Sequence, residues 1–313
     1  MAIFPSPSIS QCPIERGAAS PPSIAHDIQS SPMDEYSLDS PQHRRLLELV
    51  RAASDIDFTA YRTSTVVRRI EHRMRLSGTL TLAAYAALVE RDGAELARLV
   101  DALLIKTTSM FRDATTFAAL RELVLPALIS RRASEGATSL SVWVVGCSTG
   151  EEAYSLAMCL HEAGERLAPS MELVMLASDV DAGALESAAR GVLSAEQAAK
   201  VPEPLATRWL VPDGPAHRIA DELRETIVFA RHDVLDPRRR TPPQSIFASF
   251  DLVCCRNVLI YLDGATQATA LRRLVDVCEP GSILVLGQSE TLPNPLAPRF
   301  FSLAPPKPIF GLR

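Results

Sequence analysis

Two patterns of hydrophobic and polar positions divide the chain near residue 139. Before it, from about residue 40, apolar residues recur at helical spacing and no strand pattern is present. Ser40 is a favoured N-cap type and Pro41 a favoured first helical residue, so the first helix is expected to begin there. Helices are predicted over residues 41–53, 59–76, 81–90, 93–106 and 113–132, with breaks near Asp55, Gly78 and Asp92-Gly93.

After residue 139, short apolar runs alternate with helical stretches. The expected strands are Leu140–Val145, Leu173–Ala177, Thr226–Ala230, Phe250–Cys255 and Ser282–Gly287. The expected helices between them cover residues 151–164, 181–190 and 265–278. This alternation predicts a parallel sheet with helices on both faces. Phe300–Leu303 and Pro308–Leu312 are expected to form a closing hairpin.

Composition changes the picture at the N-terminus. Residues 1–40 contain six prolines and nine serines, a composition that predicts a disordered tail, with a partner-docking segment as the alternative. No apolar run is long enough to span a bilayer, which takes about 20 residues, so no membrane insertion is expected. The first thirty residues show no secretory signal pattern, so we expect a cytoplasmic protein.

Charge and cysteine usage narrow the class further. The 313 residues include 32 Lys and Arg against 37 Asp and Glu, and this net charge of −5 argues against a nucleic-acid partner. Five of the six cysteines lie in apolar surroundings and none forms a C-x-x-C pair, so buried thiols in a reducing compartment are expected. The six histidines show no metal-ligand spacing, so no metal is expected.

The first expected strand leads into a turn of small residues. The chain runs Val-Gly-Cys-Ser-Thr-Gly-Glu-Glu over residues 145–152 and then enters a helix. A glycine turn at this place lets a ligand approach the backbone and the first amides of the helix. A turn needed only for packing is the alternative, because Cys147 and Ser148 fit the dinucleotide-binding pattern poorly.

Acidic residues follow the next two strands. Asp179 ends the second strand, where an acid can bind ribose hydroxyls, although such an acid can also be an N-cap. Asp181 is expected to cap the next helix, and Asp233 can accept a hydrogen bond from an adenine amino group. The turn and the acids together favour a nucleoside cofactor at the carboxyl ends of the strands.

Polar residues also appear where the fourth strand ends, at Arg256 and Asn257, with Tyr261 just beyond. An arginine is rarely buried unpaired, so a structural ion pair is the alternative to a ligand contact. For Tyr261 the alternative is a packed aromatic ring with a satisfied hydroxyl.

Four segments resemble the CheR family of chemotaxis receptor glutamate methyltransferases, in the family's order. They are Thr108–Asp113, which matches T-x-F-F-R-D, and Trp143–Met158, Cys255–Tyr261 and Gly287–Glu290. The resemblance covers about residues 41–313, which is everything but the tail.

This resemblance implies an α/β fold in which a small all-α domain precedes a class I S-adenosylmethionine (SAM) methyltransferase domain. The domain has a doubly wound sheet and a small antiparallel insertion. The expected ranges are a tail at 1–40, a receptor-docking helical domain at 41–109, a methyltransferase domain at 110–313 and a β-subdomain at about 205–232. SAM is the implied cofactor and S-adenosylhomocysteine its product.

The family's functional residues carry over position by position. The implied cofactor contacts are Thr108, Arg112, Glu152, Asp179, Asp233, Val234, Arg256 and Asn257. The residues implied to orient the acceptor are Arg112 and Tyr261. The departures from the family's pattern are Met110 for a Phe, Lys106 for an Asn, Asp233 for an Asn and Leu193 for a Tyr.

The implied reaction is methylation of receptor glutamate side chains to 5-O-methyl esters. A glutamate carboxylate is ionised near neutral pH, with a reference pKa of about 4.3, so the nucleophile needs no general base. Arg112 can present a planar fork to that carboxylate, and Tyr261 can orient it. A catalytically weak SAM-binding regulatory module is the alternative, and methylation of a small molecule is disfavoured by the basic helical domain.

The second expected helix is rich in cations. Val67, Ile70 and Met74 share an apolar face, and Glu71 is the one acid between residues 62 and 75. This favours a docking face for an acidic partner over a merely solvated face, and the resemblance points to the receptors' methylation helices. The expected docking residues are Arg62, Arg69, His72, Arg73 and Arg75.

Some CheR enzymes also bind a C-terminal receptor pentapeptide at the edge of their inserted sheet. The corresponding stretch here, residues 208–219, is about three residues shorter and contains one glycine. Pro212 and Pro215 remove backbone donors that an added strand needs. We therefore expect an enzyme that does not use a pentapeptide tether. Separately, we expect a monomer.

Overall fold

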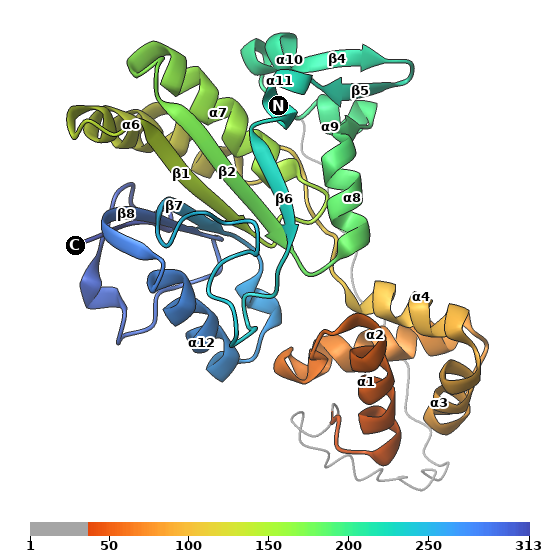
Figure 1. The fold of residues 1–313 in the computed structure, drawn as a ribbon. Helices are drawn as coiled ribbons and strands as arrows, with labels where there is room; N and C mark the ends of the chain where they lie inside the picture. The colour runs from red at the N-terminus through yellow and green to blue at the C-terminus, as the bar shows by residue number, and fades with distance from the viewer. Residues whose placement is uncertain (1–36) are drawn as a thin grey trace, which may run out of the picture. The chain divides into compact units, whose positions relative to one another are not determined.

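The computed structural model describes residues 37–313 (Figure 1). The predicted disordered tail therefore lies outside the described residues, apart from its last four positions. No helix among the described residues is long and apolar enough to cross a membrane.

The first helices pack around one small core, as predicted. They are α1 (Pro41–Ser54), η1 (Phe58–Ala60), α2 (Thr63–Leu76), α3 (Leu82–Arg91) and α4 (Gly93–Leu103). The side chain of Ser40 accepts a hydrogen bond from the His43 N–H, which confirms the predicted N-cap. Fully buried residues from four helices, such as Leu46, Ile70 and Leu99, form the core.

Two of these helices are shorter than predicted. The helix expected over 59–76 begins at Thr63, because Tyr61 is extended and pairs with Leu262 in an isolated bridge. The Arg62 N–H next to it donates to the Tyr261 carbonyl, 2.8 Å away, outside its own helix. The helix expected over 93–106 ends at Leu103, and the chain that follows is extended.

The segment predicted as one helix over 113–132 contains a wider turn. It consists of α5 (Ala114–Ala119), the π-helical turn η2 (Leu120–Val124) and α6 (Leu125–Ser134). Pro126 lies just after the wide turn. A proline has no N–H and its ring crowds the carbonyl four residues earlier, so the preceding turn widens to accommodate it.

A seven-stranded sheet forms the second part of the fold, in the order β6-β2-β1-β7-β8-β10-β9. Neighbouring strands from β6 to β8 are parallel, and β10 and β9 add an antiparallel pair that confirms the closing hairpin. The strands are β1 (Ser139–Val145), β2 (Glu172–Asp179), β6 (Ile227–Arg231), β7 (Phe250–Cys255), β8 (Cys278–Leu286), β9 (Phe300–Ser302) and β10 (Ile309–Leu312).

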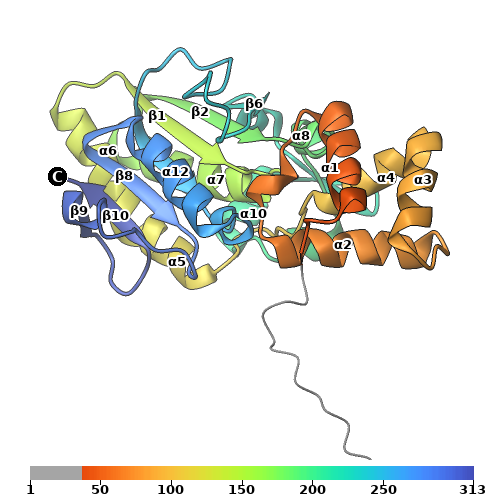
Figure 2. The same ribbon diagram turned by 90° about the horizontal axis from the view of Figure 1, so that it is seen from below.

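Helices cover both faces of this sheet, as predicted (Figure 2). Successive residues of a strand point to opposite faces. Val142 and Val144 of β1 accordingly pack in one core with α6 and α7 (Glu151–Leu167), whereas Trp143 packs in a second core with α12 (Gly264–Val275). The carboxyl ends of β1, β2, β6 and β7 lie next to one another at one edge.

A small antiparallel sheet is inserted between α8 (Ala182–Arg190) and β6. Its order is β3-β5-β4, and Figure 1 shows β4 and β5 as a hairpin at the top. Its strands and short helices are β3 (Val192–Leu193), α9 (Ala195–Ala198), α10 (Glu203–Trp209), β4 (Leu210–Asp213), β5 (Ala216–Ile219) and α11 (Asp221–Arg224). The small sheet thus begins before the expected range of about 205–232, and β6, which falls inside that range, pairs with β2 in the large sheet. A two-residue strand such as β3 is too short to show an alternating pattern in the sequence.

Candidate active-site cleft

A cleft opens at the carboxyl ends of the parallel strands and encloses about 1020 Å³, open solvent included. All the residues predicted to contact the cofactor or the acceptor line this cleft. They are Thr108, Arg112, Glu152, Asp179, Asp233, Val234, Arg256, Asn257 and Tyr261. They come from five separate segments of the chain, and the fold brings them together.

The turn after β1 adopts a conformation that only certain residues accept. Gly146 and Gly150 have φ angles of 67° and 95°, in the left-handed region. A Cβ at Gly146 would lie 2.3 Å from the Val258 side chain, so this position has no space for any other residue. The turn presents the Ser148 N–H to Asp179, 2.8 Å from Oδ2.

Asp179 is half-buried and carries two main-chain hydrogen bonds. Its Oδ1 accepts from the Asp181 N–H at 3.0 Å and its Oδ2 from the Ser148 N–H. Burial raises the pKa of Asp179, and these hydrogen bonds only partly offset the rise. Each carboxylate oxygen has two lone pairs, so each can accept one more donor from the cleft. This capacity fits the two hydroxyls of a ribose.

Asp233 lies after β6, with its Oδ1 2.8 Å from the Leu235 N–H. Burial raises the pKa of its carboxyl group. The neighbouring Val234 is buried and adds apolar surface to the cleft. A carboxyl oxygen beside an apolar wall fits the amino group and ring face of a purine.

For Arg256, the sequence left a structural ion pair as the alternative to a ligand contact, and the structure contains two such pairs. The Arg256 side chain has no exposed area and lies 2.7 Å from both Glu152 and Asp113. Burial raises the pKa of Glu152, and Arg256 only partly offsets the rise. The Nε of Arg256 and the Oδ1 of Asn257 are buried without a hydrogen-bond partner among residues 37–313. These two atoms are enclosed by the protein, so they are unsatisfied polar groups next to the cleft and not part of its exposed surface.

Arg112 lines the cleft and lies between two strained residues. Phe111 and Asp113 have φ angles of 50° and 61°, which are unfavourable for residues with a Cβ. The guanidinium donates to the Thr107 carbonyl at 2.9 Å and forms no ion pair within the described part of the chain. Arg112 can therefore receive a carboxylate.

Tyr61 and Lys106 line the cleft, although the prediction of the site did not include them. Tyr61 comes from the helical part of the chain, and burial, with the charges of Asp233 and Asp179, raises the pKa of its hydroxyl. Lys106, noted only as a departure, forms ion pairs with Asp101 and, at 3.1 Å, with Asp181. No local pattern marks Tyr61, and a lone lysine after a helix is an ordinary surface residue.

The predicted docking residues fall into two groups. One groove, here called the basic groove, is lined by Arg68, Arg69, His72, Arg73, Arg75 and Arg98. Arg62 lies elsewhere, and its side chain donates to the Leu262 carbonyl.

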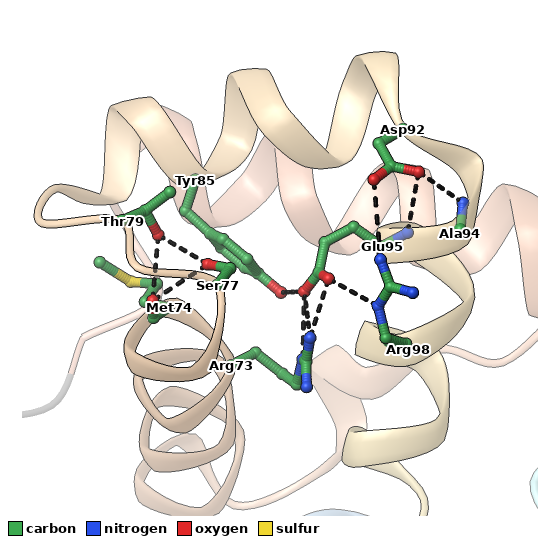
Figure 3. Close-up of polar contacts among 9 residues, drawn as sticks. All are labelled: Arg73, Met74, Ser77, Thr79, Tyr85, Asp92, Ala94, Glu95 and Arg98. Atoms are coloured by element: carbon green, nitrogen blue, oxygen red, sulfur yellow. Dashed lines mark hydrogen bonds and ion pairs between the residues drawn. The ribbon is translucent and has the colours of Figure 1, made fainter.

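Of these residues, Arg73 is committed to a network inside the helical part of the chain (Figure 3). It pairs with Glu95, and the hydroxyl of Tyr85 donates to the same carboxylate at 3.0 Å. Arg69 donates to the carbonyls of Ala102 and Leu104. His72 and Arg75 are exposed, so they are the predicted residues most available to a partner.

Within residues 37–313, no group of three or more His, Cys, Asp or Glu side chains is arranged to hold a metal ion. The polar groups of the cleft instead fit a nucleoside. Asp179 has free lone pairs for hydroxyls, and Asp233 offers a carboxyl oxygen beside the apolar surface of Val234.

Comparisons with known proteins agree with this geometry. Residues 106–304 match the family model of the CheR methyltransferase SAM binding domain, and residues 42–104 match that of the CheR methyltransferase all-alpha domain. A 104.1 kDa uncharacterized protein of Rhodobacter capsulatus is 41% identical over 79% of this chain, and the chain spans 25% of that protein.

Two named relatives are matched over most of their length. Chemotaxis protein methyltransferase of Klebsiella aerogenes is 34% identical over 79% of this chain and 82% of its own. Chemotaxis protein methyltransferase 2 of Pseudomonas aeruginosa is 31% identical over 79% of this chain and 85% of its own.

Proposed function

The chain belongs to the CheR methyltransferase family, and from this premise we propose that it methylates glutamate side chains of chemoreceptors, the methyl-accepting chemotaxis proteins. The products are glutamate 5-O-methyl esters and S-adenosylhomocysteine. The observation that carries this proposal is the cleft itself. Arg112, which forms no ion pair with a described residue, lines the same cleft as Asp179. One residue suits an acceptor carboxylate and the other a ribose.

The chain's residues need only position the two reactants. SAM supplies a methyl group that its sulfonium already activates, and the acceptor carboxylate is ionised near neutral pH. Arg112 would hold the acceptor through its planar fork, and Tyr261 would fix its direction of approach.

We assign the cofactor contacts to the residues that line the cleft. Asp179 would bind the ribose hydroxyls and Asp233 the adenine amino group, with Val234 against the ring. The remaining contacts would come from Thr108, Arg112, Glu152, Arg256 and Asn257. Glu152 and Arg256 are paired with each other, and this pair would fix their positions for the contact.

The test is transfer of radiolabel from SAM to receptor-bearing membranes, followed by alkaline release of methanol. We expect base-labile label on receptor glutamates, and strong loss of label with Arg112→Met, a variant in which no ion pair between described residues is broken. SAM binding without transfer to any receptor would favour the regulatory-module alternative. Label in a small-molecule fraction would contradict the proposed acceptor.

We also propose that the receptor binds without a pentapeptide tether. In the order β3-β5-β4, β4 is an edge strand, and Pro212 on it has no N–H to offer an incoming strand. The exposed His72 and Arg75 of the basic groove would then meet acidic receptor helices. Saturable micromolar binding of a pentapeptide-bearing receptor tail at residues 208–230 would contradict this proposal.

The domain boundary and the compartment complete the proposal. We place the helical receptor-docking domain at 41–109 and the methyltransferase domain at 110–313. We also propose that the protein is a cytoplasmic monomer. A reducing compartment fits the cysteines, of which Cys147, Cys159, Cys254 and Cys255 are free and buried. Burial raises the pKa of these four thiols, which keeps them protonated and inert.

A further inference from the structure

One carboxylate outside the predicted site holds the loop that follows β7. Glu290 is 5% exposed and accepts hydrogen bonds from four main-chain N–H groups. Its Oε2 accepts from Asn257 at 3.0 Å and from Gly287 at 2.6 Å. Its Oε1 accepts from Leu259 at 2.8 Å and from Ile260 at 3.3 Å. Three of these donors belong to the loop that carries the cleft residues Asn257 and Tyr261.

The loop needs an acceptor at this place. Asn257 has a φ angle of 59°, and the short helix η3 (Leu259–Tyr261) begins two residues later. The first N–H groups of a helix have no carbonyl partner within it, and no main-chain carbonyl among residues 37–313 accepts from Leu259 or Ile260. A single buried carboxylate therefore satisfies donors that would otherwise be buried unpaired.

Gly287 makes the approach of the two segments possible. A Cβ at this position would lie 2.8 Å from the Asn257 nitrogen and 2.8 Å from Oε2 of Glu290. The loop after β7 and the turn after β8 thus pack closely against each other through main-chain atoms. The proposed mechanism gives the Gly287–Glu290 motif no role. This contact explains why a glycine and a glutamate are needed there.

We propose that Glu290 is a positioning residue of the methyl-transfer site. It fixes the loop so that Asn257 and Tyr261 line the cleft. The Asn257 Oδ1 itself is buried and has no hydrogen-bond partner within the described residues. This inference rests on the proposed function for the identity of the site, but it is tested on SAM binding alone.

The experiment compares Glu290→Gln with Asp251→Asn by calorimetric titration with SAM. Asp251 is a matched control at the opposite end of β7, where its carboxylate accepts from the N–H and hydroxyl of Ser141 and pairs with Arg132. We expect Glu290→Gln to weaken SAM binding by about tenfold or more, the effect of one lost charge-assisted hydrogen bond. Asp251→Asn is expected to lower the unfolding temperature and leave SAM affinity unchanged.

A double-mutant cycle identifies the route through Asn257. If Glu290 acts by placing Asn257, Glu290→Gln costs about threefold or less in SAM affinity once Asn257→Ala is present. Gly287→Ala tests the same contact in a second way, and it is expected to weaken SAM binding as Glu290→Gln does.

Three results would overturn the inference. They are unchanged SAM affinity in both Glu290→Gln and Gly287→Ala, an equal loss of affinity in Asp251→Asn, and full additivity with Asn257→Ala. A wild-type protein that binds SAM but labels no receptor would instead contradict the proposed function and leave the positioning role intact.

Discussion

Arg73 and Arg256 are both shielded arginines paired with carboxylates, but their surroundings differ. Glu95 receives hydrogen bonds from Arg73, Arg98 and the Tyr85 hydroxyl, so its network is saturated within the helical domain (Figure 3). Arg256 pairs with two carboxylates, yet its own Nε has no partner among residues 37–313.

The pKa values of Glu95 and Glu152 shift in opposite directions. Burial alone would raise the pKa of Glu95, but the hydrogen bonds from its three partners outweigh burial and lower the pKa. Burial raises the pKa of Glu152, and Arg256 does not fully offset it. The acceptor atoms of Glu95 are filled within the helical domain, whereas Arg256 keeps an unpartnered nitrogen next to the cleft.

The largest effect is expected from Arg256→Met, which leaves two carboxylates without their cation. We expect a loss of about 3–5 kcal/mol in the free energy of unfolding, together with loss of SAM binding. Urea denaturation and calorimetry measure the two effects. A variant that binds SAM as the wild type does would show that the two networks do not differ in function.

Arg73→Met should lower the free energy of unfolding by about 3 kcal/mol, the lower end for a broken buried pair, because Arg98 still contacts Glu95. SAM affinity should not change, since the network lies wholly within the helical domain.

The effect of Arg73→Met should also depend on pH in a stated direction. The lowered pKa of Glu95 contributes stability above its unfolded pKa of about 4.3, and this stability is lost as the pH falls through the folded pKa. Urea denaturation of both proteins at several pH values should therefore show the difference shrinking below about pH 4. A difference that grows in acid would contradict this account of Glu95.

A smaller effect is expected when Asp179 loses its carboxylate. Asp179→Ala should weaken SAM binding by about tenfold or more, which corresponds to about 1.4 kcal/mol, because two hydroxyl hydrogen bonds are lost. Calorimetric titration measures this loss, with Asp251→Asn as the control for a carboxylate far from the cleft. Unchanged affinity would mean that the ribose binds elsewhere.

The smallest effect is expected on the exposed part of the basic groove. Changing His72 and Arg75 to Gln should raise the KM for receptor by about twofold to fivefold per residue and flatten its dependence on salt. SAM affinity should stay constant, since neither residue lines the cleft. Arg69 and Arg73 are poor choices for this test, because both bind groups within the chain. Methylation that is equally fast over a range of salt concentrations would contradict docking at this face.

The features predicted from sequence are those that repeat or that end a strand. The long periodic helices and the strand ends at Asp179 and Arg256 are local signals, and the structure places both residues on the cleft. The bond between Arg73 and Glu95, 22 residues apart, and the presence of Tyr61 in the cleft depend on tertiary packing. The four N–H groups around Glu290 belong to the backbone, which leaves no trace in residue types.

Main-chain atoms make much of the junction between the helical domain and the loop at Tyr261, beside the hydrogen bond from the Arg62 side chain to the Leu262 carbonyl. The Arg62 N–H donates to the Tyr261 carbonyl, and Tyr61 and Leu262 form a single antiparallel bridge. Main-chain pairing does not require particular side chains. The surface of α2 can therefore diverge during evolution while its connection to the reaction centre is inherited unchanged. A grafted helical domain from a relative can redirect the enzyme to a different receptor by the same logic.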